Sequence, residues 1–132
     1  MGRIILAVVV ALLMAFAVIS VAQMLTAYVV APPSSQVMTD PAAMRHYMMN
    51  VPPLGYIMVV IGWIVGAFAA GFIVTKMSRR ESPGMTLSLV VGALLTLGAI
   101  VNFVVLPHPI WFVIVGLLVF IPFSLIGHKT AK

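Results

Sequence analysis

Four long apolar segments dominate the sequence, and each is bounded by proline, glycine or a charged residue. They cover residues 4–28, 54–75, 85–106 and 110–126. Their lengths are close to the roughly 20 residues that cross a hydrocarbon core of about 30 Å. Because a bilayer offers no water to backbone amides, and because these segments lack the alternation of a β-strand, we expect four membrane-spanning helices.

Composition supports the same class. Hydrophobic residues make up 64% of the chain and the mean hydropathy is +1.26, whereas soluble domains contain roughly 45 to 50% apolar residues. The 132 residues predict one all-α transmembrane domain over 1–132, with the polar segment 32–53 as its longest loop. The absence of cysteine excludes disulfides and thiolate metal sites.

Basic residues favour one side of the expected bundle. Only Arg45 lies in the two connections on the other side, whereas the termini and the loop at 76–83 hold the remaining six: Arg3, Lys76, Arg79, Arg80, Lys129 and Lys132. The positive-inside rule then predicts that both termini are cytoplasmic. The net charge of +5 does not indicate a nucleic-acid partner, because the charges are divided among three short segments.

Small residues at four-residue spacing predict where the helices approach closely. The second segment carries two such stripes, Gly62, Gly66 and Ala70 on one and Ala67 and Gly71 on the other, and the third segment carries Ser88, Gly92 and Thr96. Short connections predict an up-down-up-down bundle. We interpret the glycine stripes as intrachain packing, with a homodimer seam as the alternative.

Polar residues are expected to gather near the outer surface. At a rise of about 1.5 Å per residue, Gln23 and Asn102 lie at similar depths, roughly 26 to 28 Å from the cytoplasmic ends of their segments. His108 and Trp111 belong to the same layer. We interpret these four residues as a wet aromatic belt with one interhelical amide bond, and a ligand-binding mouth is the alternative.

The outer loop 32–53 predicts a short interfacial helix. Asp40 and Pro41 are typical of a helix start, and an apolar stripe of Met44, Tyr47, Met48 and Val51 follows to about Asn50. The prolines and serines at 32–35 predict a stiff entry segment. In the fourth segment, Pro122 predicts a kink, and Ser124 or a neighbouring helix is expected to bond the freed carbonyl.

One metal hypothesis arises from the same loop. Met44, His46, Met48 and Met49 supply soft ligands of the kind that Cu(I) prefers. Interfacial packing of the thioethers is the favoured interpretation, and we expect no cofactor and no metal.

The sequence offers little catalytic chemistry. Its two acidic residues, Asp40 and Glu81, are expected on opposite sides of the membrane, and the four apolar segments contain no acidic residue, lysine, arginine or histidine. No nucleophile elbow, zinc-protease motif or phosphate-binding loop is present. We therefore expect a protein that is not an enzyme.

The sequence Pro107-His108-Pro109-Ile110-Trp111-Phe112, together with the segment 66–71 and the Asp40-Pro41 pair, resembles a group of small four-helix bacterial inner-membrane proteins of unknown function. The resemblance implies a bacterial inner membrane and transfers no site residues. We expect an accessory or assembly component of a larger membrane complex or homodimer, in contact with lipids and with another membrane protein or itself. The alternative is a small channel or transporter, in which a homo-oligomer lines its pore with Ser88, Thr96 and Asn102.

Overall fold

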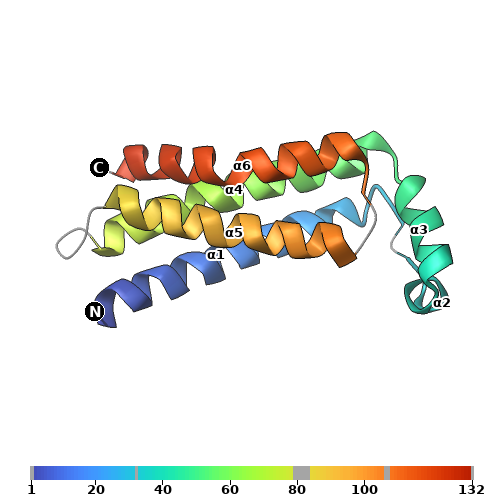
Figure 1. Cartoon of the computed structure of the whole chain (residues 1–132), viewed down its shortest axis with the longest axis horizontal. Helices are drawn as coiled ribbons and strands as arrows, with labels where there is room; N and C mark the ends of the chain where they lie inside the picture. The colour runs from blue at the N-terminus through green and yellow to red at the C-terminus, as the bar shows by residue number, and fades with distance from the viewer. Residues whose placement is uncertain (1, 32, 79–83, 106–107, 132) are drawn as a thin grey trace.

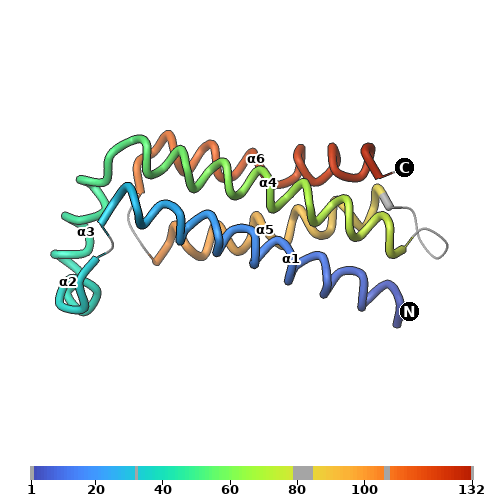
Figure 2. Tube along the Cα trace, turned by 180° about the vertical axis from the view of Figure 1, so that it is seen from behind, coloured from blue at the N-terminus to red at the C-terminus, as the bar shows by residue number. Residues whose placement is uncertain are grey.

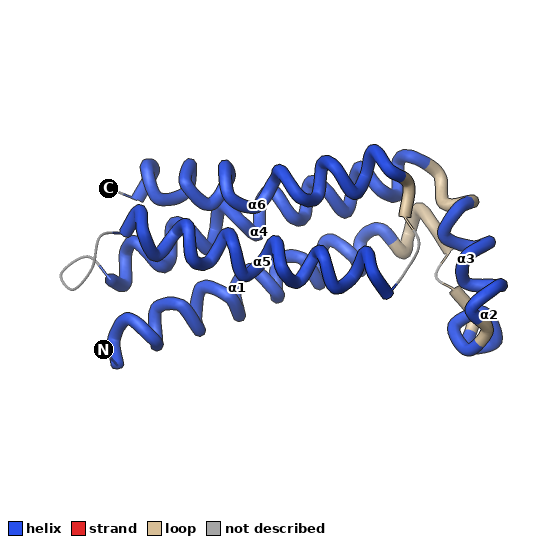
Figure 3. Tube along the Cα trace, viewed as in Figure 1, coloured by secondary structure: helices blue, strands red, loops and turns tan. Residues whose placement is uncertain are grey.

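The structure is a computed structural model that describes residues 2–31, 33–78, 84–105 and 108–131. Six helices occupy these ranges: α1 (Gly2–Thr26), α2 (Ser35–Thr39), α3 (Pro41–Met49), α4 (Pro53–Ser78), α5 (Gly84–Val105) and α6 (Ile110–Ala131). Figure 3 shows that the described part of the chain is mostly helical, with loops beside α2 and α3. The helices α1, α4, α5 and α6 are long and apolar enough to cross a membrane. The protein is therefore a four-span integral membrane protein, as the apolar segments predicted.

The four spans pack as a bundle around α4, which contacts α1, α5 and α6. The two ends of the chain lie together at one end of the bundle, and α2 and α3 lie at the other (Figures 1 and 2). We call these the terminal end and the α3 end.

Glycines allow α4 to approach two helices closely. A Cβ atom added to Gly62 would lie 2.4 Å from the Cβ of Ala22 on α1, and one added to Gly71 would lie 1.9 Å from the carbonyl oxygen of Ser124 on α6. Gly66 faces Ala15 and Ile19 of α1, Ala70 is fully buried, and Gly92 of α5 faces Ile121 of α6. The two small-residue stripes of α4 thus face different helices of the same chain.

All four spans extend beyond their predicted apolar segments at the terminal end, α4 and α6 the furthest. The helix α6 continues to Ala131 rather than ending at 126, and α4 continues to Ser78. The helices therefore include Arg3, Lys76, His128 and Lys129, which lie just beyond the predicted apolar segments, because helix ends depend on packing as well as on hydropathy. Residues 79–83 of the expected connection, with Arg79, Arg80 and Glu81, and Pro107 of the second connection lie outside the described residues.

Buried hydroxyl groups join three spans near the terminal end. The Oγ1 atom of Thr75 lies 3.2 Å from the Oγ atom of Ser88 and 3.0 Å from the Nδ1 atom of His128. Ser124 donates to the carbonyl oxygen of Ser88 on α5 over 2.8 Å, so its hydroxyl is not used for the carbonyl that Pro122 frees in its own helix. The helix α6 continues through Pro122, and its axis bends part-way along (Figure 1).

The loop between α1 and α4 forms two helices where one was expected. The predicted start of α3 is confirmed, since the side chain of Asp40 accepts a hydrogen bond from the amide of Ala42 and Pro41 follows it. The additional helix α2 begins after Ser34, whose hydroxyl accepts from the amide of Val37. The entry segment is therefore only partly extended. The helix α3 lies across the end of the bundle (Figure 1).

A cavity at the α3 end

A cavity of about 450 Å³ lies at the α3 end, between α1, α3, α4, α5 and α6. Gln23 of α1, Asn102 of α5 and His108 before α6 all line it. Three of the four residues of the predicted polar layer thus meet in one place, although they are far apart in the sequence. The match in depth between Gln23 and Asn102 is what the helical rise predicted.

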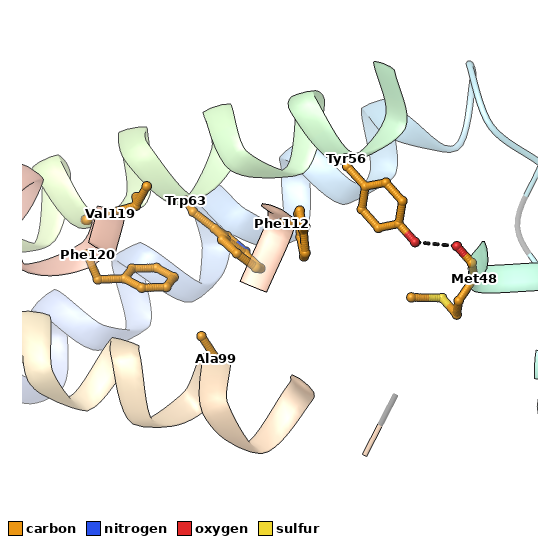
Figure 4. Close-up of a cluster of buried hydrophobic side chains, with 8 residues drawn as sticks. Met48, Tyr56, Trp63, Ala99, Phe112, Val119 and Phe120 are labelled. Atoms are coloured by element: carbon orange, nitrogen blue, oxygen red, sulfur yellow. Dashed lines mark hydrogen bonds between the residues drawn. The ribbon is translucent and has the colours of Figure 1, made fainter. Parts of the chain in front are cut away.

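Aromatic rings form the inner wall of the cavity. The ring of Phe112 lies 4.7 Å from that of Tyr56 and 4.9 Å from that of Trp63, and His108 stacks on Phe112 at 5.3 Å. Figure 4 shows Phe112 between Tyr56 and Trp63, with Phe120 and Val119 continuing the core beyond Trp63. Since Phe120 packs against Trp63 at 5.4 Å, buried side chains close the cavity toward the middle of the bundle.

The helix α3 covers the cavity with its apolar stripe. Met48 is buried, while Met44, Tyr47 and Val51 are half-buried, and all four line the cavity. The hydroxyl of Tyr47 donates to the carbonyl oxygen of Ala31, and that of Tyr56 donates to the carbonyl oxygen of Met48. Burial raises the pKa of Tyr47 above its ordinary value, so this hydroxyl stays protonated as a donor. These bonds fix the lid that α3 forms.

The remaining wall comes from α1 and the turn that follows it. Gln23, Thr26, Ala27 and Val30 line the cavity at a helical spacing of i, i+3, i+4 and i+7. The hydroxyl of Thr26 is already used, because it donates to the carbonyl oxygen of Ala22. Among the residues that pack in the core cluster at this end, Ile19 is the one that α1 supplies. The helix α1 therefore borders an open space here.

The amides of Gln23 and Asn102 face this space without a protein partner. Within the described part of the chain, neither side chain takes part in a hydrogen bond, and the expected amide bond between them is not formed. Gln23 is exposed and Asn102 is half-buried, so neither amide is a buried group that lacks a partner. The cavity thus presents two side-chain amides to a bound molecule, and each amide can both donate and accept hydrogen bonds.

Of the four residues predicted for the polar layer, Trp111 is the one that does not line the cavity. Its ring contacts Tyr56 edge-on at 6.0 Å and its side chain is 43% exposed, outside the cavity lining. The aromatic wall of Tyr56, Trp63 and Phe112 was not predicted. Aromatic residues within an apolar segment give no sequence signal of the face on which they lie.

The four candidate copper ligands are not brought together. Met44 and Met48 line the cavity, whereas His46 lies in a separate surface hollow beside Asn50, and Met49 is 60% exposed. The thioethers of Met44 and Met48 pack against the aromatic core cluster. This arrangement favours the packing interpretation over a shared metal site.

Comparisons with protein-family models, with curated proteins and with solved structures found no match. The resemblance to small four-helix membrane proteins is thus supported as far as four long apolar helices.

Proposed function

We propose that this protein is a non-enzymatic accessory component of its membrane that binds a small amphipathic molecule in the cavity at the α3 end. The observation that carries the proposal is the pair of unbonded amides, Gln23 and Asn102, facing a space otherwise lined mainly by apolar and aromatic side chains. Small-molecule sites are typically of about 300 to 1,000 Å³, largely apolar, with a few convergent polar groups. The cavity has these properties.

The packing of α5 favours binding over conduction. Ser88, on the face that a dimeric pore would use, is fully buried against Thr75, and the hydroxyl of Thr96 donates to the carbonyl oxygen of Gly92 in its own helix. The part of that face that holds Ser88 and Thr96 is therefore occupied by contacts within one chain. A small channel remains the second candidate, because two amides from different helices at a half-open cavity are also typical of a pore mouth.

The accessory role is supported by the exposed side of α1. This helix packs mainly against α4 and leaves Leu13 and Phe16 exposed by 65% and 71%. In the membrane this apolar side contacts lipid, another membrane protein or a second copy of the chain. From the resemblance to small four-helix proteins we propose a bacterial inner membrane, and from the distribution of basic residues we propose that the α3 end lies outside and both termini lie in the cytoplasm.

A titration tests the binding function. The chain has two tryptophans, so a Trp111→Phe variant in mild detergent leaves Trp63, on the cavity wall, as the only indole. Adding 1-octanol should shift the emission of Trp63 along a saturable curve. In the same background, Ala27→Phe fills the cavity and should abolish the shift, while Ala17→Phe, which lies on α1 outside the cavity lining, should preserve it. A non-saturable shift that is equal in all three proteins would refute the binding site.

A flux measurement distinguishes the small channel from the binding protein. Proteoliposomes loaded with a small uncharged solute should release it no faster than liposomes without protein. Faster release that Ala27→Phe blocks would establish the pore instead.

A further inference from the structure

The helices α1 and α5 contact each other only slightly and are connected mainly through α4. Near the terminal end, Ala7 and Ala11 of α1 belong to the same buried cluster as Leu87 and Val91 of α5. At the other end, Gln23 and Asn102 both line the cavity. Because these two helices contact each other so little, we take the flank between α1 and α5 as the route into the cavity.

Hydrocarbon borders that flank. On α1, Met24 is 68% and Leu25 is 54% exposed, and on α5, Val101 is 62% and Val104 is 81% exposed. In a span, exposed apolar side chains of this kind contact lipid chains. A molecule that enters between α1 and α5 therefore comes from the bilayer rather than from water.

Taking the ends of α1 and α5 as the edge of the hydrocarbon core places the two amides near the depth of the lipid ester groups. Gln23 is three residues from the end of α1 at Thr26, and Asn102 is three residues from the end of α5 at Val105. At about 1.5 Å per residue, both lie roughly 4.5 Å inside the helix ends. The ester carbonyls of phospholipids lie at the same boundary between headgroup and hydrocarbon, and they accept hydrogen bonds from amide N–H groups.

A cation lies beside the cavity on α3, outside the four spans. Arg45 of α3 lines a neighbouring hollow with Phe103 and Val104 at the end of α5, and Met44 lines both the hollow and the cavity. Arginine binds phosphate through charge-assisted hydrogen bonds, and basic residues near a membrane surface favour anionic lipids.

The apolar cavity suits an acyl chain, the two amides suit an ester carbonyl, and Arg45 suits a phosphate, which are the three kinds of group that a phospholipid carries. We propose that a phospholipid of the adjacent leaflet occupies this site, with one acyl chain in the cavity against Trp63. The amides of Gln23 and Asn102 donate to its ester carbonyl, and Arg45 binds its phosphate. This inference rests on the proposed function and names the ligand class of the same cavity.

Brominated lipids test the acyl chain, because bromine quenches indole fluorescence only at short range. Trp63 is 5% exposed and is shielded from bulk lipid by the bundle. In nanodiscs of phosphatidylglycerol with brominated acyl chains, the Trp111→Phe protein should lose emission relative to unbrominated nanodiscs. Adding Ala27→Phe should restore the emission, and adding Ala17→Phe should not. Equal quenching with Ala27→Phe and Ala17→Phe, or no quenching in any protein, would overturn the inference.

A substitution at Arg45 tests the proposed contact with the lipid phosphate. Arg45→Gln should reduce the quenching of Trp63, whereas Lys129→Gln, an exposed charge at the terminal end, should leave it unchanged. Equal quenching in both variants would contradict the role of Arg45. If octanol binds saturably in detergent but brominated chains never quench Trp63, the phospholipid inference is wrong and the binding function still stands. If neither probe responds, the binding function fails with it.

Discussion

Tyr56 of α4 donates its hydroxyl to the carbonyl oxygen of Met48 in α3, and the bond is buried beside the cavity (Figure 4). The residues are eight positions apart, and the chain between them passes from the lid into a span. The bond therefore holds α3 over the aromatic wall, and it links the cover of the cavity to the most central helix of the bundle.

Removing this bond should loosen the lid. Tyr56→Phe keeps the ring contacts but leaves the Met48 carbonyl without its donor, at an expected cost of about 1 kcal/mol. The melting temperature in mild detergent should fall measurably. Tyr28→Phe, at a side chain that is 88% exposed, should not change it. Equal melting temperatures for the two variants would mean that the bond does not hold α3 in place.

The contact between α4 and α6 should be sensitive to a single methyl group. Gly71→Ala places a Cβ atom 1.9 Å from the carbonyl oxygen of Ser124, so the helices must move apart, at a cost of about 3 kcal/mol. Gly98→Ala meets nothing within 4 Å and should stabilise α5 by about 0.5 to 1 kcal/mol through helix propensity. Reversible unfolding in mixed micelles measures both. A neutral Gly71→Ala would mean that α6 does not pack against this position.

The hydroxyl network should contribute modestly to stability. Thr75→Val removes contacts to both Ser88 and His128 while keeping the shape of a side chain that is 4% exposed. Interhelical hydrogen bonds in membranes contribute about 0.6 to 2 kcal/mol, so a loss in that range is expected in the same unfolding assay. Thr96→Val, which removes only a bond within α5, should cost less. A larger loss for Thr96→Val would contradict the interhelical role of Thr75.

High pH should release the lid at Tyr47. Its folded pKa is raised above the ordinary value of 10.0 by burial, so its contribution to stability is present below pH 10 and is lost as the pH rises through the folded pKa. The difference in tyrosinate absorbance between the native protein and Tyr47→Phe should titrate with a midpoint above 10. A midpoint at or below 10 would contradict the docked position of Tyr47.

The proposed orientation makes a separate prediction. An alkaline-phosphatase reporter fused after Ala43, in α3, should be active, because the α3 end is expected outside the cytoplasm. The same reporter fused after Lys132 should be inactive. The reverse pattern would invert the topology without affecting the fold.

The spans were predictable because their signal is local and repeated over some 20 residues. The similar depths of Gln23 and Asn102 could be predicted, because the fixed rise of a helix converts sequence position into height along its axis. The helix start at Asp40 was equally local. By contrast, α2 was missed because the prolines beside Ser34 outweighed the capping role of its hydroxyl.

The cavity itself was not predictable. Whether Trp63 or Trp111 faces inward depends on the rotation of each helix, which packing against α4 determines and hydropathy does not. The continuation of α6 to Ala131 likewise depends on the contact between His128 and Thr75, 53 residues away in the sequence. Such tertiary contacts leave no periodic pattern in a segment that is apolar on every side.

A crystal structure of the protein grown from a lipid mesophase tests the central claim most directly. The account predicts elongated density in the cavity at the α3 end, running from the amides of Gln23 and Asn102 to the ring of Trp63. A structure in which α1 closes against α5, with the two amides bonded to each other and no space beside Trp63, would contradict it.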